Sequence, residues 1–460
     1  MTSSPADVGT ATHAVTTPSS PQVATAAGVM HDAFSAACPL PYRVVACVIF
    51  GVWGWGLMLQ LLSRRQINVE SLLSIAPVAG TSASGNISAV PLFRPVYALA
   101  TTLTLVYIVN ATAFSLISTS APTLLNAFGY NLLPLLCLAS VPVVFLFPGY
   151  HLHRAGRVSF MRTLRRAAFG GLERDSARRF QDTLATDVLT SYAKVLGDAW
   201  IMMCMFFFCG GCAVAAAPPD RKCGGEWAVP LVIALPYLAR LRQCLTEYLR
   251  SRGNGGKGER RHLWNAAKYT TTFPVIVLSV LQHQYDVSEH ATVLGAFLLH
   301  NLWVLSMFVN SMFSFYWDVT VDWDLELFRR PPLLSASSAS SSLTTEPKML
   351  SIPQPTATST GMLLHRGLRS ILYFSPRLYY TAILLDLLFR FTWSIKLSPH
   401  LYFFNEFESG VFVLELIELC RRWVWLMLRI EAEWIKNTHV QSGRLPIAMA
   451  ELGRLHNARD

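Results

Sequence analysis

The chain has 460 residues, of which 52% are hydrophobic and only 14% are charged, and its mean hydropathy is +0.37. A typical soluble domain carries about a quarter charged residues, so this composition argues against a water-soluble globular protein. The formal net charge is +10. A nucleic-acid-binding protein is also disfavoured, because a soluble basic face would not alternate with long apolar stretches.

Nine apolar stretches approach the length of about 20 residues that a helix needs to cross a bilayer. In chain order they are Tyr42 to Leu62, Val96 to Ser118, Leu132 to Phe147, Leu184 to Ala216, Ala228 to Leu249, Trp264 to Leu281, Ala291 to Tyr316, Tyr373 to Lys396 and Gly410 to Trp434. The predicted fold class is therefore all-α, a polytopic transmembrane helical bundle.

Low-complexity segments divide the chain into regions. Residues 1–36 are rich in Ser, Thr, Ala and Pro and are predicted to be a disordered cytosolic tail. Residues 331–361 are rich in Ser and are predicted to be a flexible loop between spans. We expect N-terminal membrane helices over 37–183, the main transmembrane domain over 184–437, and a cytosolic tail over 438–460.

Three loops rich in Arg and Lys are predicted to face the cytosol, because short cytosolic loops are enriched in these residues. They are Arg174 to Arg179, Arg250 to Arg261, and Arg329 through Arg369. Two apolar stretches lie between each successive pair of loops, and two more follow the last, which puts the C-terminus in the cytosol. Three stretches precede the first loop, which is an odd number.

The odd number leaves two arrangements open. Either the N-terminus is lumenal, or Leu152 to Gly170 forms a fourth, polar helix buried in protein, since arginines cross a membrane only where they face protein or water. We favour the second, which gives about ten spans, cytosolic N- and C-termini, and a lumenal Asn86 within a glycosylation sequon. The alternative for this segment is a basic amphipathic helix on the membrane surface.

The nine cysteines lie mostly inside apolar stretches and are interpreted as buried thiols, since Cys packs as a small hydrophobic residue. Cys209 and Cys212 form a C-x-x-C motif, but the second pair of ligands that a zinc site needs is missing. We therefore predict no metal and no cofactor.

Ionisable residues inside the predicted spans form stripes on helix faces, and such residues are costly in a membrane unless they are paired or hydrated. The last span carries Glu415, Glu418, Arg422, Trp425 and Arg429 in steps of three and four residues, with Arg421 beside Arg422. The span before it carries Asp386, Arg390 and Trp393. The stretch from Leu184 carries Asp187, Thr190 or Ser191, Lys194 and Asp198.

These stripes indicate an anion pathway, because an arginine guanidinium offers a planar pair of donors that matches two phosphate oxygens. Supporting ion pairs from Asp386, Glu415, Glu418 and Arg429 would hold the guanidinium groups and keep the anion from binding too tightly to leave. The alternative is that Glu418 with Arg422, and Asp386 with Arg390, are ion pairs that only join helices.

Asp318 and Asp322 lie one helical turn apart, each beside a tryptophan. Two close carboxylates could bind a cation, relay protons or balance the arginines. The alternative is that the tryptophans anchor a span at the interface and the acids are solvated.

The sequence contains Tyr316-Trp317-Asp318-x-x-x-Asp322-Trp323, then Arg390-Phe391-Thr392-Trp393, and finally the stretch from Glu418 to Asn437. Together these resemble the YWDxxxDW signature, the RFxW motif and the closing motif of the EXS family of phosphate exporters. Weaker similarity is found in Asn265 to Thr270 and in Pro236 to Leu245.

The resemblance implies that the chain moves inorganic phosphate out of the cytosol or between compartments. The residues it implies as lining the phosphate path are Asp187, Arg240, Lys268, Tyr269, Asp318, Asp322, Arg390, Trp393, Arg421 and Arg422. Asp324 stands where the family has glycine, and Thr190 and Ala193 stand where other members have Asn and Ser, so details of phosphate coordination are expected to differ.

No SPX domain precedes the membrane part, so control through that domain is not expected. Cys38 to Trp55 resembles the start of short members of the family that are linked to retention of endoplasmic-reticulum proteins and associated with the Golgi. The predicted function is a Golgi-membrane phosphate transporter that returns phosphate from the lumen to the cytosol and so supports glycosylation. Its expected partners are inorganic phosphate, membrane lipid and, in a homo-oligomer, further copies of the chain, with no nucleic acid.

The alternative function is a non-transporting Golgi protein that binds glycosyltransferases or sorting factors and helps to retain resident proteins. An enzyme is not expected, because no pairing of nucleophile and base, metal-ligand set or Gly-rich phosphate loop is found in the sequence.

Overall fold

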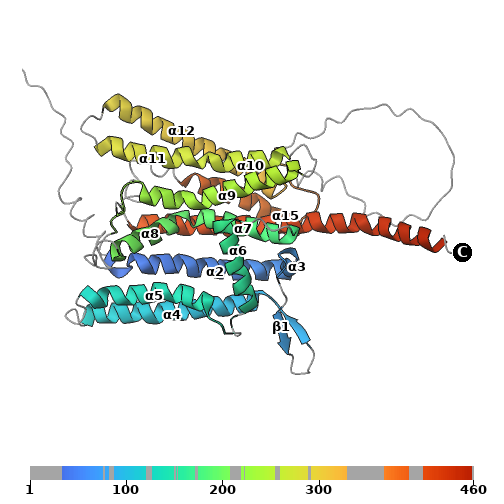
Figure 1. The fold of residues 1–460 in the computed structure, drawn as a ribbon, viewed down its shortest axis with the longest axis horizontal. Coiled ribbons are helices and arrows are strands. Elements are labelled where there is room, and N and C mark those ends of the chain that lie inside the picture. Colours follow the sequence, from blue (N-terminus) through green and yellow to red (C-terminus); the bar gives the residue numbers. More distant parts are fainter. Residues whose placement is uncertain are drawn as a thin grey trace, which may run out of the picture.

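The computed structural model describes residues 34–75, 78–81, 87–120, 127–149, 152, 154–170, 175–207, 219–221, 223–253, 259–287, 292–328, 367–392 and 408–457. These residues are almost entirely helical, which confirms the predicted all-α transmembrane class. Most of the helices run side by side in one bundle (Figure 1). One short hairpin accompanies them, in which β1 (Val78–Thr81) pairs antiparallel with β2 (Ile87–Val90).

The helices in chain order are α2 (Leu40–Arg64), α3 (Val69–Leu72), α4 (Phe93–Ser120), α5 (Ala127–Leu146), α6 (Arg154–Phe169), α7 (Ser176–Ser191), α8 (Ala193–Phe207), α9 (Ala228–Gly253), α10 (Arg260–Thr270), α11 (Thr272–Val287), α12 (Val293–Trp317), the π-helix η2 (Asp318–Asp322), α13 (Pro376–Arg390) and α15 (Glu408–Asn457). Within the described part of the chain, four helical stretches are long and apolar enough to cross a membrane, namely Leu40–Arg64, Phe93–Ser118, Ala228–Gly253 and Val293–Asp322.

Two of the predicted spans are broken into two helices each. The stretch from Leu184 is divided at Tyr192 between α7 and α8, and the stretch from Trp264 is divided at Thr271 between α10 and α11. Each piece has 11 to 16 residues, about half to four-fifths of the length that crosses a bilayer, so no single piece is long enough to cross by itself. The count of about ten spans stays a prediction.

Helices α2 and α15 run parallel through the centre of the bundle. Arg43, near the start of α2, pairs with Glu408 at the start of α15, with 2.6 Å between Nη1 and Oε2. Further along, the rings of Phe50 and Trp423 lie 4.2 Å apart. A Cβ atom at Gly54 would lie 1.8 Å from the Trp423 ring, so only glycine allows this close approach of the two helices.

The bundle has two chemically different ends. At one end, which we call the basic end, α2 and α9 finish and α7 and α10 begin, and this end carries Arg64, Arg65, Arg178, Arg179, Arg250, Arg252, Arg260 and Arg261. The opposite end, which we call the disulfide end, holds a disulfide between Cys204 of α8 and Cys223. Basic loops mark the cytosolic side and disulfides persist in oxidising compartments. From these two independent signals we expect the basic end to face the cytosol and the disulfide end to face the lumen.

The disulfide corrects the interpretation of every cysteine as a thiol. Cys204 lies inside an apolar helix, but its partner follows 19 residues later in the connection between α8 and α9, with 6.0 Å between the Cα atoms. Cys47, Cys137 and Cys244 are buried thiols, as predicted. Cys209 and Cys212 lie outside the described residues.

The structure also corrects the predicted topology of the N-terminal half. Helix α6 was expected to be a fourth span buried in protein, but only three of its 16 residues, Arg157, Thr163 and Ala167, are buried. It lies across the other helices (Figure 1), and Arg157 donates hydrogen bonds to carbonyl groups at the end of α5, including that of Phe147 at 2.6 Å. This agrees with the alternative of an amphipathic helix at the membrane surface.

Which compartment each terminus faces stays a prediction. Since α2 and α15 run parallel, the start of α2 lies at the disulfide end and the C-terminal end of α15 extends from the basic end (Figure 1). Of the two arrangements left open by the sequence, we therefore expect the one with a lumenal start. Asn86 lies outside the described residues, but strands β1 and β2 on either side of it follow the end of α2, at the basic end.

We predict that a tag placed before α2 and a tag at the C-terminus report opposite sides of the membrane. In sealed vesicles of the protein's membrane with the cytosolic side outward, added protease should remove the C-terminal tag and spare the N-terminal tag, because we expect the basic end to face the cytosol. A tag inserted after Gly255, in the basic loop between α9 and α10, is the control and should behave like the C-terminal tag. Removal of both terminal tags would contradict the parallel course of α2 and α15.

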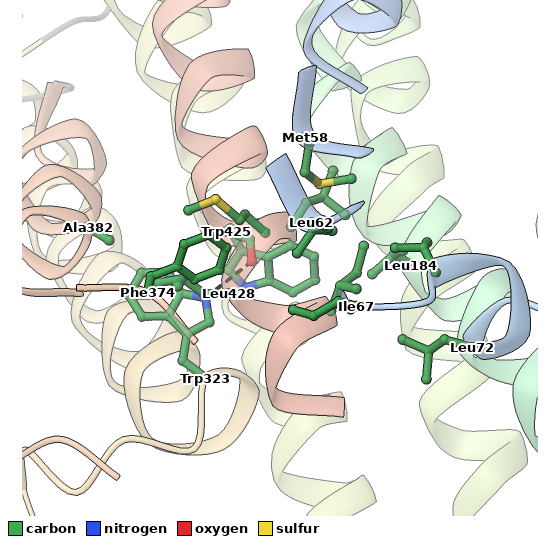
Figure 2. Packing of buried hydrophobic residues seen from close by; sticks show 14 of the residues in the cluster. Met58, Leu62, Ile67, Leu72, Leu184, Trp323, Phe374, Ala382, Trp425 and Leu428 are labelled. Atoms are coloured by element: carbon green, nitrogen blue, oxygen red, sulfur yellow. Dashed lines mark hydrogen bonds between the residues drawn. The ribbon is translucent and has the colours of Figure 1, made fainter. Parts of the chain in front are cut away.

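A hydrophobic core lies toward the basic end, where α2, α3, α7, α13 and α15 meet. Figure 2 shows Trp323 and Trp425 packed side by side in it, and Trp323 Nε1 donates a hydrogen bond to the backbone carbonyl of Trp425 at 3.3 Å. Both rings are almost completely buried. This core fixes the segment after η2 against the middle of α15.

Beside this core, Glu431 of α15 holds the segment that leads into α13. Its side chain is fully buried, with 0% exposed, and its Oε2 lies 2.6 Å from Nη2 of Arg369. The Tyr379 hydroxyl and the backbone N–H of Tyr373 both donate to its Oε1. This glutamate therefore joins α13 and its preceding segment to α15.

We expect Glu431→Ala to lower the free energy of unfolding by about 3–5 kcal/mol, because it leaves Arg369 as an unpaired buried charge. The matched control is Glu433→Ala, two residues on, whose side chain is 26% exposed and pairs with Arg429 at 3.2 Å. That change should cost about 1 kcal/mol. The measurement is thermal unfolding of both variants in detergent, and equal losses would show that Glu431 does not hold this joint.

Candidate functional site

Interrupted helices meet near the middle of the bundle and bring polar side chains together there. Helix α7 ends at Ser191, α10 ends at Thr270, and α13 ends at Arg390. Helix α12 continues into the π-helix η2, and short π-helical turns often occur at functional sites. Breaks of this kind in membrane helices are typical of substrate and ion sites, because they direct polar groups into the bundle.

Asp318, in the first position of η2, is the hub of the site. It is almost completely buried and pairs with Arg390 of α13. Its Oδ2 also lies 3.6 Å from Nη1 of Arg421, and its Oδ1 lies 3.9 Å from Nζ of Lys268. One carboxylate thus stands between cations from α10, α13 and α15.

Asp386 and Glu418 bind the same arginines from the other side. Arg390 Nε donates to Asp386 Oδ2 at 3.0 Å, and Arg421 Nη1 donates to Asp386 Oδ1 at 2.9 Å. Arg421 also donates two hydrogen bonds to Glu418, at 2.8 Å and 2.6 Å. The sequence alternative paired Glu418 with Arg422, whereas the structure pairs it with Arg421, three residues on.

A second set of contacts surrounds Asp187 of α7. Arg240 Nε donates to Asp187 Oδ1 at 2.5 Å, and the Tyr269 hydroxyl donates to the same oxygen at 2.6 Å. Arg240 also donates to Gln243 at 3.1 Å, so its guanidinium is fixed from two sides. All four side chains are buried.

Arg422 differs from the other arginines of the site because it binds hydroxyl groups. Its Nε donates to Ser191 Oγ at 2.6 Å and its Nη2 to Thr190 Oγ1 at 3.2 Å, and its guanidinium lies 4.7 Å from the centroid of the Trp425 ring. No carboxylate of the described residues is recorded within ion-pair distance of it. This buried cation therefore lacks a local counter-ion of its own.

Asp322, at the end of η2, is the point at which the site continues toward the basic end. Its carboxylate lies 3.9 Å from Nζ of Lys268 and 3.7 Å from Nε of Arg429. Two residues further, Asp324 has φ of +55°, a left-handed conformation that favours glycine and that Asp tolerates. This explains why Asp324 can stand where the resemblance expects glycine.

The structure brings together all but one of the residues implied as lining a phosphate path. Those that meet are Asp187, Arg240, Lys268, Tyr269, Asp318, Asp322, Arg390, Arg421 and Arg422. Trp393 lies outside the described residues. Of the supporting residues, Asp386 and Glu418 pair with arginines as described, and Arg429 pairs with Glu433.

Glu415 was predicted to take part in an ion pair, and the structure corrects this. Among the described residues no Lys or Arg side chain lies within ion-pair distance of it, and the sulfur of Cys47 lies 3.8 Å from its Oε2. The physical reason is that the neighbours at three and four residues on α15 are Glu418 and Leu419, so no cation follows at helical spacing.

A second charged cluster at the disulfide end was missed by the sequence analysis. Glu408 binds Arg43 at 2.6 Å and Arg221 at 2.9 Å, and Arg221 also binds Asp198 of α8 at 3.2 Å. Arg43 could have been noticed as an ionisable residue at the start of an apolar stretch. Arg221 carried no such signal, because its connection is placed by the fold and by the disulfide at Cys223.

Within the described part of the chain, no group of three His, Cys, Asp or Glu side chains is placed to hold a metal ion. The fold and the site define a polytopic membrane protein with a buried network of arginines and carboxylates between interrupted helices. The profile of the EXS family matches residues 38–435, and the chain belongs to this family.

Curated relatives agree with this assignment. The chain is 27% identical to Protein ERD1 homolog 2 of Schizosaccharomyces pombe over 421 residues, covering 85% of this chain and 95% of the relative. It is 31% identical to Protein ERD1 of Kluyveromyces lactis over 265 residues, covering 55% and 59%. It is also 26% identical to a Xenopus laevis xenotropic and polytropic retrovirus receptor 1 homolog, covering 56% of this chain and 33% of that protein.

Proposed function

We propose that this chain transports inorganic phosphate across the Golgi membrane, from the lumen to the cytosol, and so supports glycosylation. The observation that carries the proposal is the set of buried and partly buried cations supplied by four segments of the bundle, among which Arg422 binds, within the described residues, only hydroxyl groups and a ring. A phosphate dianion supplies the acceptor oxygens that such guanidinium groups match.

The charges of the network are balanced in a way that suits an exchangeable anion. Five cations face five carboxylates, which are Arg240, Lys268, Arg390, Arg421 and Arg422 against Asp187, Asp318, Asp322, Asp386 and Glu418. An entering phosphate does not meet a site with a large excess of positive charge, which would hold it too tightly. It competes with carboxylates that already occupy the guanidinium groups.

Lys268 and Arg422 are the cations that phosphate would reach at the lowest cost. The two carboxylate contacts of Lys268 are long, both 3.9 Å, and its Nζ also lies 4.6 Å from the centroid of the Tyr269 ring. Both cations act electrostatically on Asp187 and on Asp318, so they serve the same region of the site. Phosphate held there draws Arg390 and Arg421 from Asp318, and the return of these arginines to Asp318 releases it.

The polar residues follow one line along α15, which gives the ion a route between the two ends. In order from the disulfide end they are Glu408, Glu415, Glu418, Arg421, Arg422 and Arg429. Basic side chains at the exit toward the cytosol would attract phosphate released there only weakly, because solvated charges are screened over about 8 Å at physiological salt. In this proposal the chain has no enzymatic activity, and the network only binds and passes the ion.

Thermal unfolding of the purified chain in detergent tests the binding step. Phosphate at about 100 times its dissociation constant should stabilise the folded chain by about 2.7 kcal/mol, whereas chloride at equal ionic strength should not. Stabilisation by phosphate no greater than that by chloride would contradict the proposal. It would favour the alternative of a Golgi protein that acts by binding resident enzymes or sorting factors.

A further inference from the structure

Glu415 is a buried carboxyl group on the polar face of α15 that pairs with no cation of the phosphate network. Its side chain is only 4% exposed, and its Oε1 has no hydrogen-bond partner. The Cys47 thiol, a weak donor, lies 3.8 Å from Oε2. The carboxylates of the network differ from it, since Asp318, Asp386 and Glu418 each pair with at least one arginine.

The charged groups around Glu415 are already engaged with other partners. On α2, Arg43 is bound to Glu408, and Arg221 of the connection before α9 is bound to Glu408 and Asp198. Lys194 of α8 acts on Glu415 electrostatically, but it is exposed and not within ion-pair distance. The other facing charges are the acids Asp198 of α8 and Glu408 and Glu418 of its own helix. Within the part of the chain that the structure describes, no cation is left within ion-pair distance of Glu415 to balance its ionised form.

The part of α15 that carries Glu415 packs in a hydrophobic cluster of Val44, Cys47, Val195 and Leu419, with Phe412, Leu416 and Tyr192 packed against it, and the Cys47 thiol lies against Glu415 itself. An unpaired carboxylate in such a place costs several kcal/mol more than the neutral acid, because it loses water without gaining a counter-ion. The neutral form carries one O–H donor and keeps acceptor capacity, which the weak Cys47 thiol donor at Oε2 can use. Both facts favour a carboxyl that carries a proton.

We propose that Glu415 is a proton-binding site that couples the movement of phosphate to that of a proton, which rests on the function proposed above. A proton from the disulfide end adds to the Glu415 carboxylate to form the neutral acid. It leaves as H⁺ when the acid ionises again, and no other bond forms or breaks.

The coupling follows from the position of Glu415 on α15. It lies one turn before Glu418, which holds Arg421 and accepts from Ser191, and two turns before Arg422. Ionised, Glu415 adds negative charge beside the guanidinium groups and competes with phosphate for them. When Glu415 is neutral, the guanidinium groups remain available to phosphate. Proton and phosphate binding therefore favour each other, and this effect is reciprocal by linkage.

The test compares phosphate uptake by liposomes that contain the full chain, at about pH 6 and about pH 7.5 outside, with the inside held constant. We expect uptake by the wild type to be about fivefold higher at the lower pH, and uptake by Glu415→Gln, whose amide stays neutral, to change less than about twofold. Glu70→Gln, on α3 and outside the network, is the control and should respond as the wild type does. Phosphate itself takes up protons in this range, and comparison of the variants removes this contribution.

The same pH response in Glu415→Gln and in the wild type would overturn the proposal. A second measurement tests the proton site even if neither the wild type nor its variants transport phosphate. Ionisation of the unpaired Glu415 should lower the midpoint of thermal unfolding of the wild type as the pH rises, and this loss should be smaller in Glu415→Gln. If the wild type does not transport phosphate but loses more thermal stability with rising pH than Glu415→Gln does, the proposed transport is refuted and the proton site stands. If the two chains lose stability equally, the proton site is refuted.

Discussion

Replacement of Arg422 by alanine is expected to reduce phosphate transport by about 100-fold or more, because two charge-assisted donors to one anion are lost. The folded chain should survive this change. Ser191 keeps its hydrogen bond to Glu418 and Thr190 keeps its bond to the carbonyl of Asp187, so no buried charge is left unpaired. The measurement is phosphate uptake per folded molecule in liposomes, with thermal unfolding recorded for each variant.

Arg421 is the matched comparison, since it is the neighbouring arginine with different partners. Arg421 Nη2 lies 2.6 Å from Glu418 Oε1, and Arg421 Nη1 lies 2.9 Å from Asp386 Oδ1, so its removal takes a close cation from both carboxylates. Arg421→Ala should therefore lose both transport and several kcal/mol of stability. Arg422→Lys separates charge from geometry, because an ammonium cannot offer two parallel donors. Phosphate uptake at the wild-type rate in Arg422→Ala or Arg422→Lys would show that Arg422 is not part of the proposed phosphate site.

Asp318→Asn is expected to tighten phosphate binding by about tenfold or more while it slows transport. Asp318 is the carboxylate shared by Arg390, Arg421 and Lys268, and the amide removes its negative charge at nearly constant volume. The three cations then have more attraction left for phosphate, and no carboxylate at the hub competes to release it. Such a change in affinity corresponds to about 1.4 kcal/mol.

The measurement for Asp318→Asn is phosphate-dependent thermal stabilisation together with uptake. Asp324→Asn is the control, since this carboxylate lies nearby in the chain but is 58% exposed and contacts Lys436 at a long 3.7 Å. It should bind and transport phosphate as the wild type does. Weaker phosphate binding in Asp318→Asn would contradict the exchange between carboxylate and phosphate.

Local spacing predicted some contacts of the site correctly. Asp386 and Arg390 are four residues apart on one helix, and the structure has this pair at 3.0 Å. The ionisable stripe of α15 likewise faces the other helices of the site. Such contacts depend only on the helical repeat, which the sequence shows directly.

Contacts between distant segments were not predictable from spacing. The hub at Asp318 depends on a π-helical turn and on arginines 72 residues or more away. The disulfide partner of Cys204 is Cys223, in the connection between α8 and α9, and pairings of cysteines do not follow from sequence alone. The arginines of α6 were compatible with a buried helix or a surface helix, and the exposure of most of its residues in the folded chain favours the surface helix.

Glu415 shows the same limit within a single helix. Its place on the ionisable face was predicted correctly, but its surroundings come from α2 and α8 rather than from α15. Cations that might have paired with it are engaged with Glu408 and Asp198. An ion pair can be predicted only where both partners share one helix, and Glu415 has no such partner.

The central claim is that the buried network binds phosphate and lets it cross the membrane. Its most direct test is uptake of radiolabelled phosphate by liposomes that contain the purified wild-type chain, compared with liposomes without protein. The account predicts uptake that saturates with phosphate, requires the protein, and falls when unlabelled phosphate, but not chloride, is added in excess. Uptake equal to that of protein-free liposomes, by a chain shown to be folded, would contradict it.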